Sequence, residues 1–296
     1  MKTNAVLLLA LTLLGFDCMA VECNDWQNIH QEWIWCDDFE NDSSLENNYF
    51  EVVRANGRFG VAQENAFDGN SSLKATYIPG SLQAGNVKFS FGKTLVAPTR
   101  YTVEKFNEIY WRFYVLHEAG WLGNPAKLTR AMVFSKPDWS QAAIGHLWEN
   151  SSLGLKLDPA SGVVGSSVVT NGYNDFNNLT WLGGIAGNLE IYAQENTNKW
   201  HCIEVHMALN TSSQANGIFE FWINDTLQGA RNDLNWRGSY TDYGINAIFL
   251  ENYSNNSVPQ EQSRFIDNFV VSRERIGCEV NIGISRPNPP SNLKIN

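Results

Sequence analysis

Charged side chains are scarce in this 296-residue chain, and the basic ones are outnumbered. Charged residues make up 18%, and 21 Lys and Arg stand against 31 Asp and Glu, for a formal net charge of −10. Binding to a nucleic-acid backbone needs a basic face, so we expect no nucleic-acid partner. The sequence also lacks a C-x-x-C pair, a G-x-S-x-G motif and a P-loop. Zinc or redox sites, serine hydrolases and nucleotide-binding enzymes therefore lose their usual signatures.

Long hydrophobic runs are missing except near the N-terminus. Lys2 precedes an apolar run over residues 5–16 (AVLLLALTLLGF), and the small residue Ala20 offers a cleavage site before Val21. The run is shorter than the roughly 20 residues that a membrane-spanning helix needs. Residues 1–20 are therefore predicted to be a signal peptide, followed by one exported domain over 21–285 without a membrane span. The Pro-rich segment 286–296 (RPNPPSNLKIN) is predicted to be an extended tail.

Aromatic and apolar residues are plentiful, and they alternate with polar ones. Hydrophobic residues make up 43% of the chain and aromatic ones 12%. A period of two is typical of half-buried strands. It recurs in segments 109–115, 130–134, 143–148, 201–207, 218–224, 247–253 and 264–271. Glycine-rich and polar turns separate them, and no strong amphipathic helix is present. The pattern predicts an all-β protein: a two-sheet antiparallel jelly roll, or concanavalin A-like sandwich.

Four cysteines remain once the predicted signal peptide is removed: Cys23, Cys36, Cys202 and Cys278. An even number in an exported protein predicts two disulfide bonds. Four cysteines allow three pairings, and their positions alone do not choose among them.

Several segments together resemble the secreted jelly-roll proteins related to glucuronan lyases, a group that includes fungal cellulose-induced proteins. They are CDDFE (36–40), IYWRFYV (109–115), WHCIEVHMAL (200–209), FEFWIND (219–225) and RFIDNFVVSRERIGC (264–278). The resemblance implies the jelly roll and a polysaccharide lyase that cleaves a uronic-acid polymer by β-elimination. It also implies that Cys202 pairs with Cys278, which leaves Cys23 for Cys36.

The resemblance further implies a structural calcium ion. Its carboxylate ligands would be Glu40, Asp68 and Asp267, with backbone carbonyls completing the six to eight oxygens that calcium takes. The alternative is that these acidic residues only solvate a strand end and a turn, where such residues are common.

A lyase must neutralise a uronate carboxylate, remove the C5 proton and protonate the leaving oxygen. Lys127 and Arg130 in KLTRAMVF (127–134) stand where the related lyases carry basic residues, so they are candidates for the carboxylate. His146 is the candidate base because an imidazole titrates near neutrality. Tyr253 is the candidate proton donor. The alternative is that His146 is a core residue and the two cations are loop charges.

Strand alternation also predicts a binding groove. In HCIEVHM (201–207), Glu204 and His206 share one face. With residues of other strands they could form a polar, aromatic groove on one sheet, and the predicted substrate-binding residues are Arg112, Trp148, Glu204, His206 and Glu251. The alternative is the solvated face of an antiparallel sheet.

Two other functions compete with the lyase. The 11 Trp residues suit a non-catalytic, lectin-like module that binds polysaccharide by ring stacking, and the net charge of −10 favours it over a polyuronate enzyme. A glycoside hydrolase could use Glu204, Glu220 or Glu251 as a carboxylate pair. However, the E-x-D-x-E string of jelly-roll glucanases is absent, and so are the R-x-E-x-R and Q-[IV]-H motifs of alginate lyases.

Overall fold

The computed structural model describes residues 22–97, 99–123 and 126–278, so the predicted signal peptide and Pro-rich tail lie outside the described residues. Helical segments are short. They are α1 (Trp26–Ile29), α2 (Leu45–Asn48) and the 3-10 turns η1 (Asp42–Ser44), η2 (Phe176–Asn178) and η3 (Gln194–Asn196). No helix in the described part of the chain is long and apolar enough to cross a membrane.

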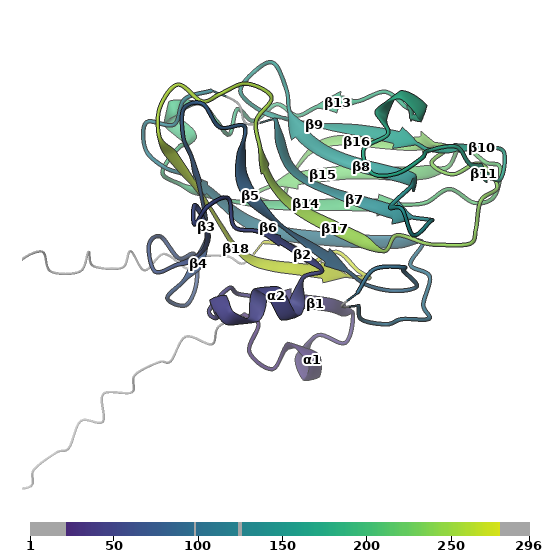
Figure 1. Ribbon diagram of the computed structural model, residues 1–296, viewed down its shortest axis with the longest axis horizontal. Coiled ribbons are helices and arrows are strands. Elements are labelled where there is room, and N and C mark those ends of the chain that lie inside the picture. The colour runs from purple at the N-terminus through teal and green to yellow at the C-terminus, as the bar shows by residue number, and fades with distance from the viewer. Residues whose placement is uncertain (1–21, 98, 124–125, 279–296) are drawn as a thin grey trace, which may run out of the picture.

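Two large antiparallel sheets form the body of the protein (Figure 1). Sheet A runs in the order β16 (Thr226–Leu234), β15 (Gly217–Ile223), β14 (Trp200–Ala208), β6 (Glu108–His117), β18 (Gln262–Ser272), β4 (Ser72–Tyr77) and β3 (Phe59–Ala62), and β1 (Trp33–Asp37) also pairs with β18. Sheet B runs in the order β12 (Thr180–Trp181), β9 (Leu155–Ser161), β8 (Gln141–Glu149), β7 (Lys127–Phe134), β17 (Ala247–Tyr253), β5 (Gln83–Ser90) and β2 (Glu51–Val53), and β13 (Ile185–Ala186) also pairs with β9. The strands β10 (Val163–Val164) and β11 (Ser167–Val168) form a separate hairpin.

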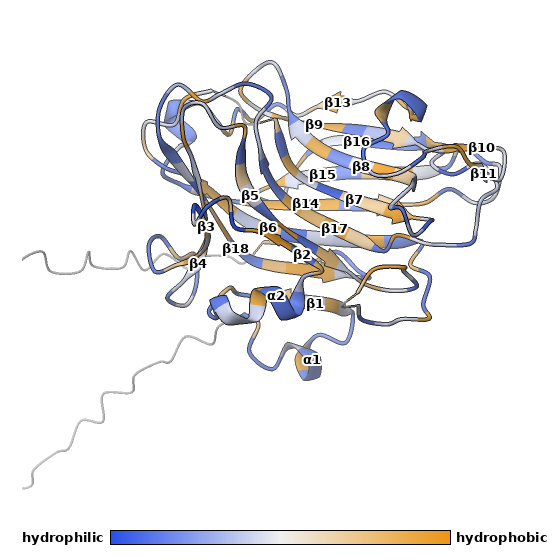
Figure 2. Ribbon diagram, viewed as in Figure 1, coloured by the Kyte–Doolittle hydropathy of each residue, from blue (hydrophilic) through white to orange (hydrophobic). Residues whose placement is uncertain are grey.

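The main hydrophobic core lies between the two sheets. Alternate residues of each strand enter it, for example Val205 of β14 and Val133 of β7. Figure 2 shows the resulting mixture of polar and apolar positions along the strands. The indole nitrogen of Trp111, in sheet A, donates a hydrogen bond to Oγ1 of Thr129 in sheet B at 3.0 Å. The two facing layers confirm the predicted all-β sandwich.

The two disulfide bonds pair as the resemblance implied. Cys23 is bonded to Cys36 of β1, and Cys202 of β14 is bonded to Cys278, which follows β18. Both bonds tie a segment near one end of the described chain to a strand of sheet A. Beside the second bond, the Glu204 carboxylate accepts hydrogen bonds from the backbone N–H of residues 276 and 277, at 2.6 and 3.2 Å.

Candidate functional site

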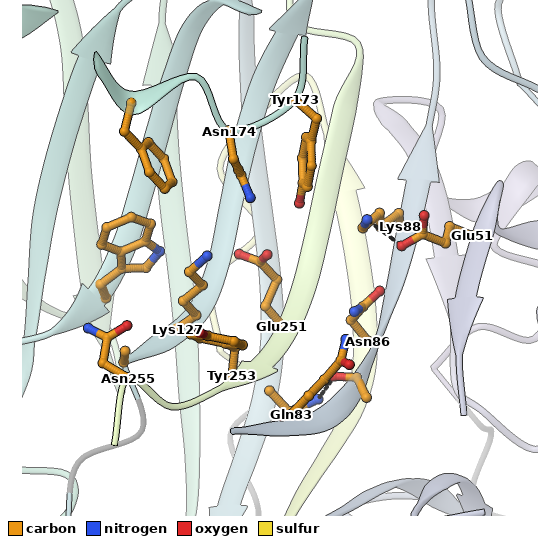
Figure 3. A pocket seen from close by; sticks show the side chains of 15 residues that line it. Glu51, Gln83, Asn86, Lys88, Lys127, Tyr173, Asn174, Glu251, Tyr253 and Asn255 are labelled. Atoms are coloured by element: carbon orange, nitrogen blue, oxygen red, sulfur yellow. Dashed lines mark hydrogen bonds and ion pairs between the residues drawn. The ribbon is translucent and has the colours of Figure 1, made fainter. Parts of the chain in front are cut away.

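A groove of about 540 Å³ crosses the outer face of sheet B, the face turned away from sheet A. It runs across the strands from β8 through β7, β17 and β5 to β2 (Figure 3). Its lining is rich in amides, aromatic rings and charged groups: Glu51, Gln83, Gly85, Asn86, Lys88, Ala126, Lys127, Trp148, Tyr173, Asn174, Phe176, Glu251, Asn252, Tyr253 and Asn255. Lys127, Trp148, Glu251 and Tyr253 were all predicted site residues, and the fold brings them together here.

Strand geometry explains how these side chains reach the groove. In β17, Ile248 and Leu250 enter the main core, so Glu251 and Tyr253 lie on the outer face. In β7 the pairing register with β8 shifts between Lys127 and Thr129. This irregularity changes the simple alternation, and it lets both Lys127 and Arg130 reach the outer face although three positions separate them.

Arg130 forms the floor of the groove and does not line it. Its side chain is fully buried, with Nη2 2.9 Å from a carboxylate oxygen of Glu251. Nη1 donates to Oδ1 of Asn174 at 2.9 Å, and Nη2 also donates to the hydroxyl of Tyr173. The expectation that Arg130 meets a substrate carboxylate is therefore not supported by this arrangement. The guanidinium instead fixes the Tyr173–Asn174 segment over the sheet, because both of its terminal nitrogens donate to protein groups.

His146 is also buried, and this position does not favour its predicted role as a base, which stays a prediction. The side chain is fully buried on the outer side of β8, 3.9 Å between ring centres from Trp148 and 5.6 Å from Trp181. Nδ1 donates to the backbone oxygen of Asp158 at 2.8 Å, since a carbonyl can only accept. Burial, followed by the nearby Arg130 charge, holds the pKa of His146 well below its usual value. The lowered pKa favours the neutral ring, and burial keeps the ring from contact with a polymer in the groove.

Lys127 and Tyr253 are the accessible pair. The Lys127 ammonium lies 4.9 Å from the ring centre of Tyr253, 5.4 Å from that of Trp148 and 5.8 Å from that of Phe176. Figure 3 shows Lys127 and Tyr253 side by side. Burial lowers the pKa of Lys127 from its ordinary value of 10.5; Glu251 opposes this effect, whereas Arg130 adds to it. Within the described ranges, no carboxylate lies within ion-pair distance of the ammonium.

The far end of the groove holds a second, neutralised cation. Lys88 forms an ion pair with Glu51, and its ammonium lies 4.8 Å from the ring centre of Tyr173 and 4.9 Å from that of Phe249. The groove and its floor hold three cations and two carboxylates. The cations are Lys88, Lys127 and Arg130, and the carboxylates are Glu51 and Glu251. The local charge is positive by one, although the whole chain has a net charge of −10. Lys127 supplies the excess.

Arg264 supports the groove from behind, and the sequence analysis missed it. This fully buried side chain belongs to β18 in sheet A. Its Nη1 donates to the backbone oxygens of Lys127 and Glu251, both at 3.2 Å, and its Nε donates to Nε2 of His117 at 3.0 Å. The guanidinium thus links the two central strands of the groove to the opposite sheet. No motif marks it, because an Arg in a strand pattern reads as a solvent-facing residue. Asn86 of β5 and the turn residues Tyr173 and Asn174 were missed as well, because no motif marks them.

Three predicted substrate-binding residues lie on the wrong sheet for this groove. Arg112, Glu204 and His206 lie on β6 and β14 of sheet A, and all three are buried. His206 is held between the carboxylates of Glu220 and Glu108, 2.9 Å from each. The prediction that these residues share one groove with Glu251 is wrong, because alternation places side chains on a face but does not say which sheet a strand joins.

The predicted calcium ligands lie near one another but are engaged with backbone groups. A Glu40 oxygen accepts from the N–H of residues 70 and 71 at 2.7 and 2.9 Å, and an Asp267 oxygen accepts from the N–H of residue 67 at 2.7 Å. Burial raises the pKa of Asp267 to about 8, and the nearby Asp38 adds to the rise. Oxygen donors of this kind suit calcium. Yet across the described residues no three His, Cys, Asp or Glu side chains are grouped as a metal site requires. The calcium ion stays an expectation of the resemblance.

The chain was compared with known protein families, curated proteins and solved structures. No protein-family model matches the chain, and no curated protein matches its sequence. Among solved structures, similar ones include an endo-β-1,4-glucuronan lyase from the fungus Trichoderma reesei (TM-score 0.54, 13% identity, 82% of this chain and 96% of that one). Alginate lyases from Chlorella virus (TM-score 0.57, 16% identity, 82% and 100%) and from Aplysia kurodai (TM-score 0.55, 11% identity, 82% and 99%) are also similar. At these identities the likeness concerns the fold: this chain has the jelly-roll fold of the glucuronan and alginate lyases.

Proposed function

We propose that this protein is a polysaccharide lyase that cleaves a uronic-acid polymer by β-elimination in the groove of sheet B. One observation carries the proposal. Lys127 and Tyr253 are the titratable lining side chains that no ion pair or hydrogen bond to another described residue engages. They lie side by side, with the ammonium 4.9 Å from the Tyr253 ring centre. An acid and a base in reach of one sugar are what elimination needs.

The roles follow from the environment of each group. Only the free amine of a lysine can accept a proton, and the lowered pKa of Lys127 increases the fraction of that form at a given pH. In the proposed reaction its Nζ takes the C5 proton, the C4–O4 bond breaks, and a double bond forms between C4 and C5. The Tyr253 hydroxyl gives its proton to O4, and the lysine proton then returns to the tyrosine oxygen. No proton is consumed overall.

The uronate carboxylate must carry extra negative charge while C5 loses its proton, and hydrogen-bond donors lower the energy of that state. Side-chain amides of Asn86, Asn174 and Gln83 line the same groove and can donate to it. This replaces the role predicted for Arg130, whose guanidinium is covered. While Lys127 is protonated, the groove carries one excess positive charge, which favours the approach of a polyanion against the negative charge of the whole protein. In its free-amine form Lys127 no longer supplies that charge, and the amides contact the carboxylate.

The test is ultraviolet absorbance of unsaturated uronate ends during incubation with glucuronan, alginate, pectate and glycosaminoglycans. We expect a signal with at least one polymer and its loss in Tyr253→Phe. Lys127→Arg keeps the charge but removes the usable base, so it should abolish turnover if Lys127 is the base. Full activity of Lys127→Arg would contradict that role. Lys199→Arg, at an exposed lysine in a loop, is the matched control.

A lectin-like binding module is the second candidate, and the aromatic rings at one end of the groove favour it. If no polymer of the panel gives an absorbance signal and the protein is retained on an insoluble glycan, the binding module is supported over the lyase. The hydrolase alternative has less support. The two groove carboxylates, Glu51 and Glu251, are both ion-paired, whereas Glu204 and Glu220 lie on sheet A. Products with reducing ends but no unsaturation would favour it.

A further inference from the structure

Three aromatic rings gather at the β8 end of the groove. Trp148 of β8, Phe176 of η2 and Trp181 of β12 form what we call the aromatic platform, with ring centres 6.1 to 6.4 Å apart. Phe176 is 36% exposed and Trp181 is 42% exposed. Large apolar rings that are this exposed and this close together are typical of a binding surface.

The platform adjoins the groove. Trp148 and Phe176 line the groove, and Trp181 extends the surface along the strand order toward the edge of sheet B. The Lys127 ammonium lies within 6 Å of Trp148 and Phe176 on one side and of Tyr253 on the other. The reacting pair and the platform are therefore adjacent, and one polymer chain crossing the strands would meet both.

His146 supports the platform from below. Its fully buried ring packs 3.9 Å from Trp148 and makes an angle of 28° with Trp181 at 5.6 Å. The hydrogen bond from Nδ1 to the oxygen of Asp158 fixes the imidazole. A ring held in this way keeps the two indoles in place before a ligand arrives, which reduces the entropy cost of binding. His146 is thus a positioning residue and not a catalytic one.

We propose that the aromatic platform binds one pyranose ring of the same polymer, next to the uronate held between Lys127 and Tyr253. The apolar C–H face of the sugar would stack on the exposed rings. The identity of the polymer rests on the proposed function. If the platform binds a sugar ring, oligosaccharides long enough to reach it should bind more tightly than shorter ones.

The first experiment measures kcat and KM against chain length. Glucuronan and alginate oligosaccharides from disaccharide to octasaccharide are compared for the natural protein, Trp181→Ala and Trp181→Phe. We expect Trp181→Ala to raise KM about tenfold for the long oligosaccharides, about 1.4 kcal/mol of binding. The KM of the shortest cleaved oligosaccharide and all kcat values should stay unchanged, and Trp181→Phe should keep most of the affinity. A KM that does not change, or one that changes equally at every length, would overturn the proposal.

Two further variants separate the platform from general damage. Trp222→Ala removes an indole from the other sheet, where it packs on Arg275 at 4.7 Å, and should leave KM unchanged. His146→Gln should raise KM for long oligosaccharides as Trp181→Ala does, without altering the pH profile of kcat. A change in that profile would instead make His146 part of the reaction.

Calorimetric binding separates failure of the platform from failure of the lyase. If no polymer is cleaved, the same octasaccharides are titrated into the natural protein and into Trp181→Ala. A lower affinity of the variant supports the platform in a protein that only binds. Equal affinity, or no binding of any octasaccharide to the natural protein, overturns it.

Discussion

Glu251 sits at the centre of the candidate site, and replacing it should cost stability as well as activity. In Glu251→Gln the carboxylate charge is lost while the side chain keeps its size. The Arg130 guanidinium then stays fully buried with only neutral partners, the hydroxyl of Tyr173 and the amide of Asn174. The segment that covers the groove depends on that guanidinium.

The size of the effect can be worked out from burial. Arg130 is fully buried, and the Glu251 side chain is 7% exposed, so solvent screens the 2.9 Å pair very little. Removing one partner of a buried pair costs about 3–5 kcal/mol. Since glutamine still offers an oxygen acceptor, we take the lower end, about 3 kcal/mol. With an unfolding entropy of about 2.1 cal/mol/K per residue over roughly 250 residues, the melting temperature should fall by about 6 °C.

The assay is thermal unfolding followed by circular dichroism at pH 7. Glu261→Gln, at an exposed glutamate, is the control and should melt with the natural protein. A double variant, Arg130→Met with Glu251→Leu, should recover more than half of the lost stability because it leaves no charge unpaired. If Glu251→Gln melts within about 1 °C of the control, the buried pair is not what holds the groove together, and the reasoning fails.

Three more predictions follow from single features. Because the pKa of Lys127 is lowered from 10.5, kcat/KM should rise with pH below that value as the amine loses its proton; a flat or falling profile, or the same limb in Lys127→Arg, would contradict the base role. If the resemblance is right about calcium, a chelator should lower the melting temperature, and Asp267→Ala should remove the difference; identical melting curves with and without chelator would end that expectation. The Cys202–Cys278 bond closes a loop with a sequence separation of 76. Chain-entropy arithmetic gives it about 4.5 kcal/mol, so a Cys202→Ser, Cys278→Ser double variant should unfold at a distinctly lower denaturant concentration, and an unchanged midpoint would refute the estimate.

The alternating pattern was enough to predict the sandwich and several side-chain positions. In β14 the pattern HCIEVHM correctly separated Ile203 and Val205, which enter the core, from Glu204 and His206, which face outward. The same local rule placed Tyr253 and Glu251 on one face of β17. Period two is a property of each strand by itself, so sequence determines it directly. The cysteine count predicted two disulfide bonds, and the resemblance supplied their pairing.

Tertiary structure decided which of these outward faces became a site. Strand order sends β14 to sheet A and β17 to sheet B, which separates Glu204 and His206 from Glu251. Arg130 and His146 do face outward, but residues distant in the chain cover them, and local alternation contains no information about such coverage. The role of Arg264 could not be predicted from sequence either, because its hydrogen-bond partners belong to other strands. The sequence by itself determined the fold class and the chemistry available; packing between distant segments decided that Lys127 and Tyr253 remain open to the groove.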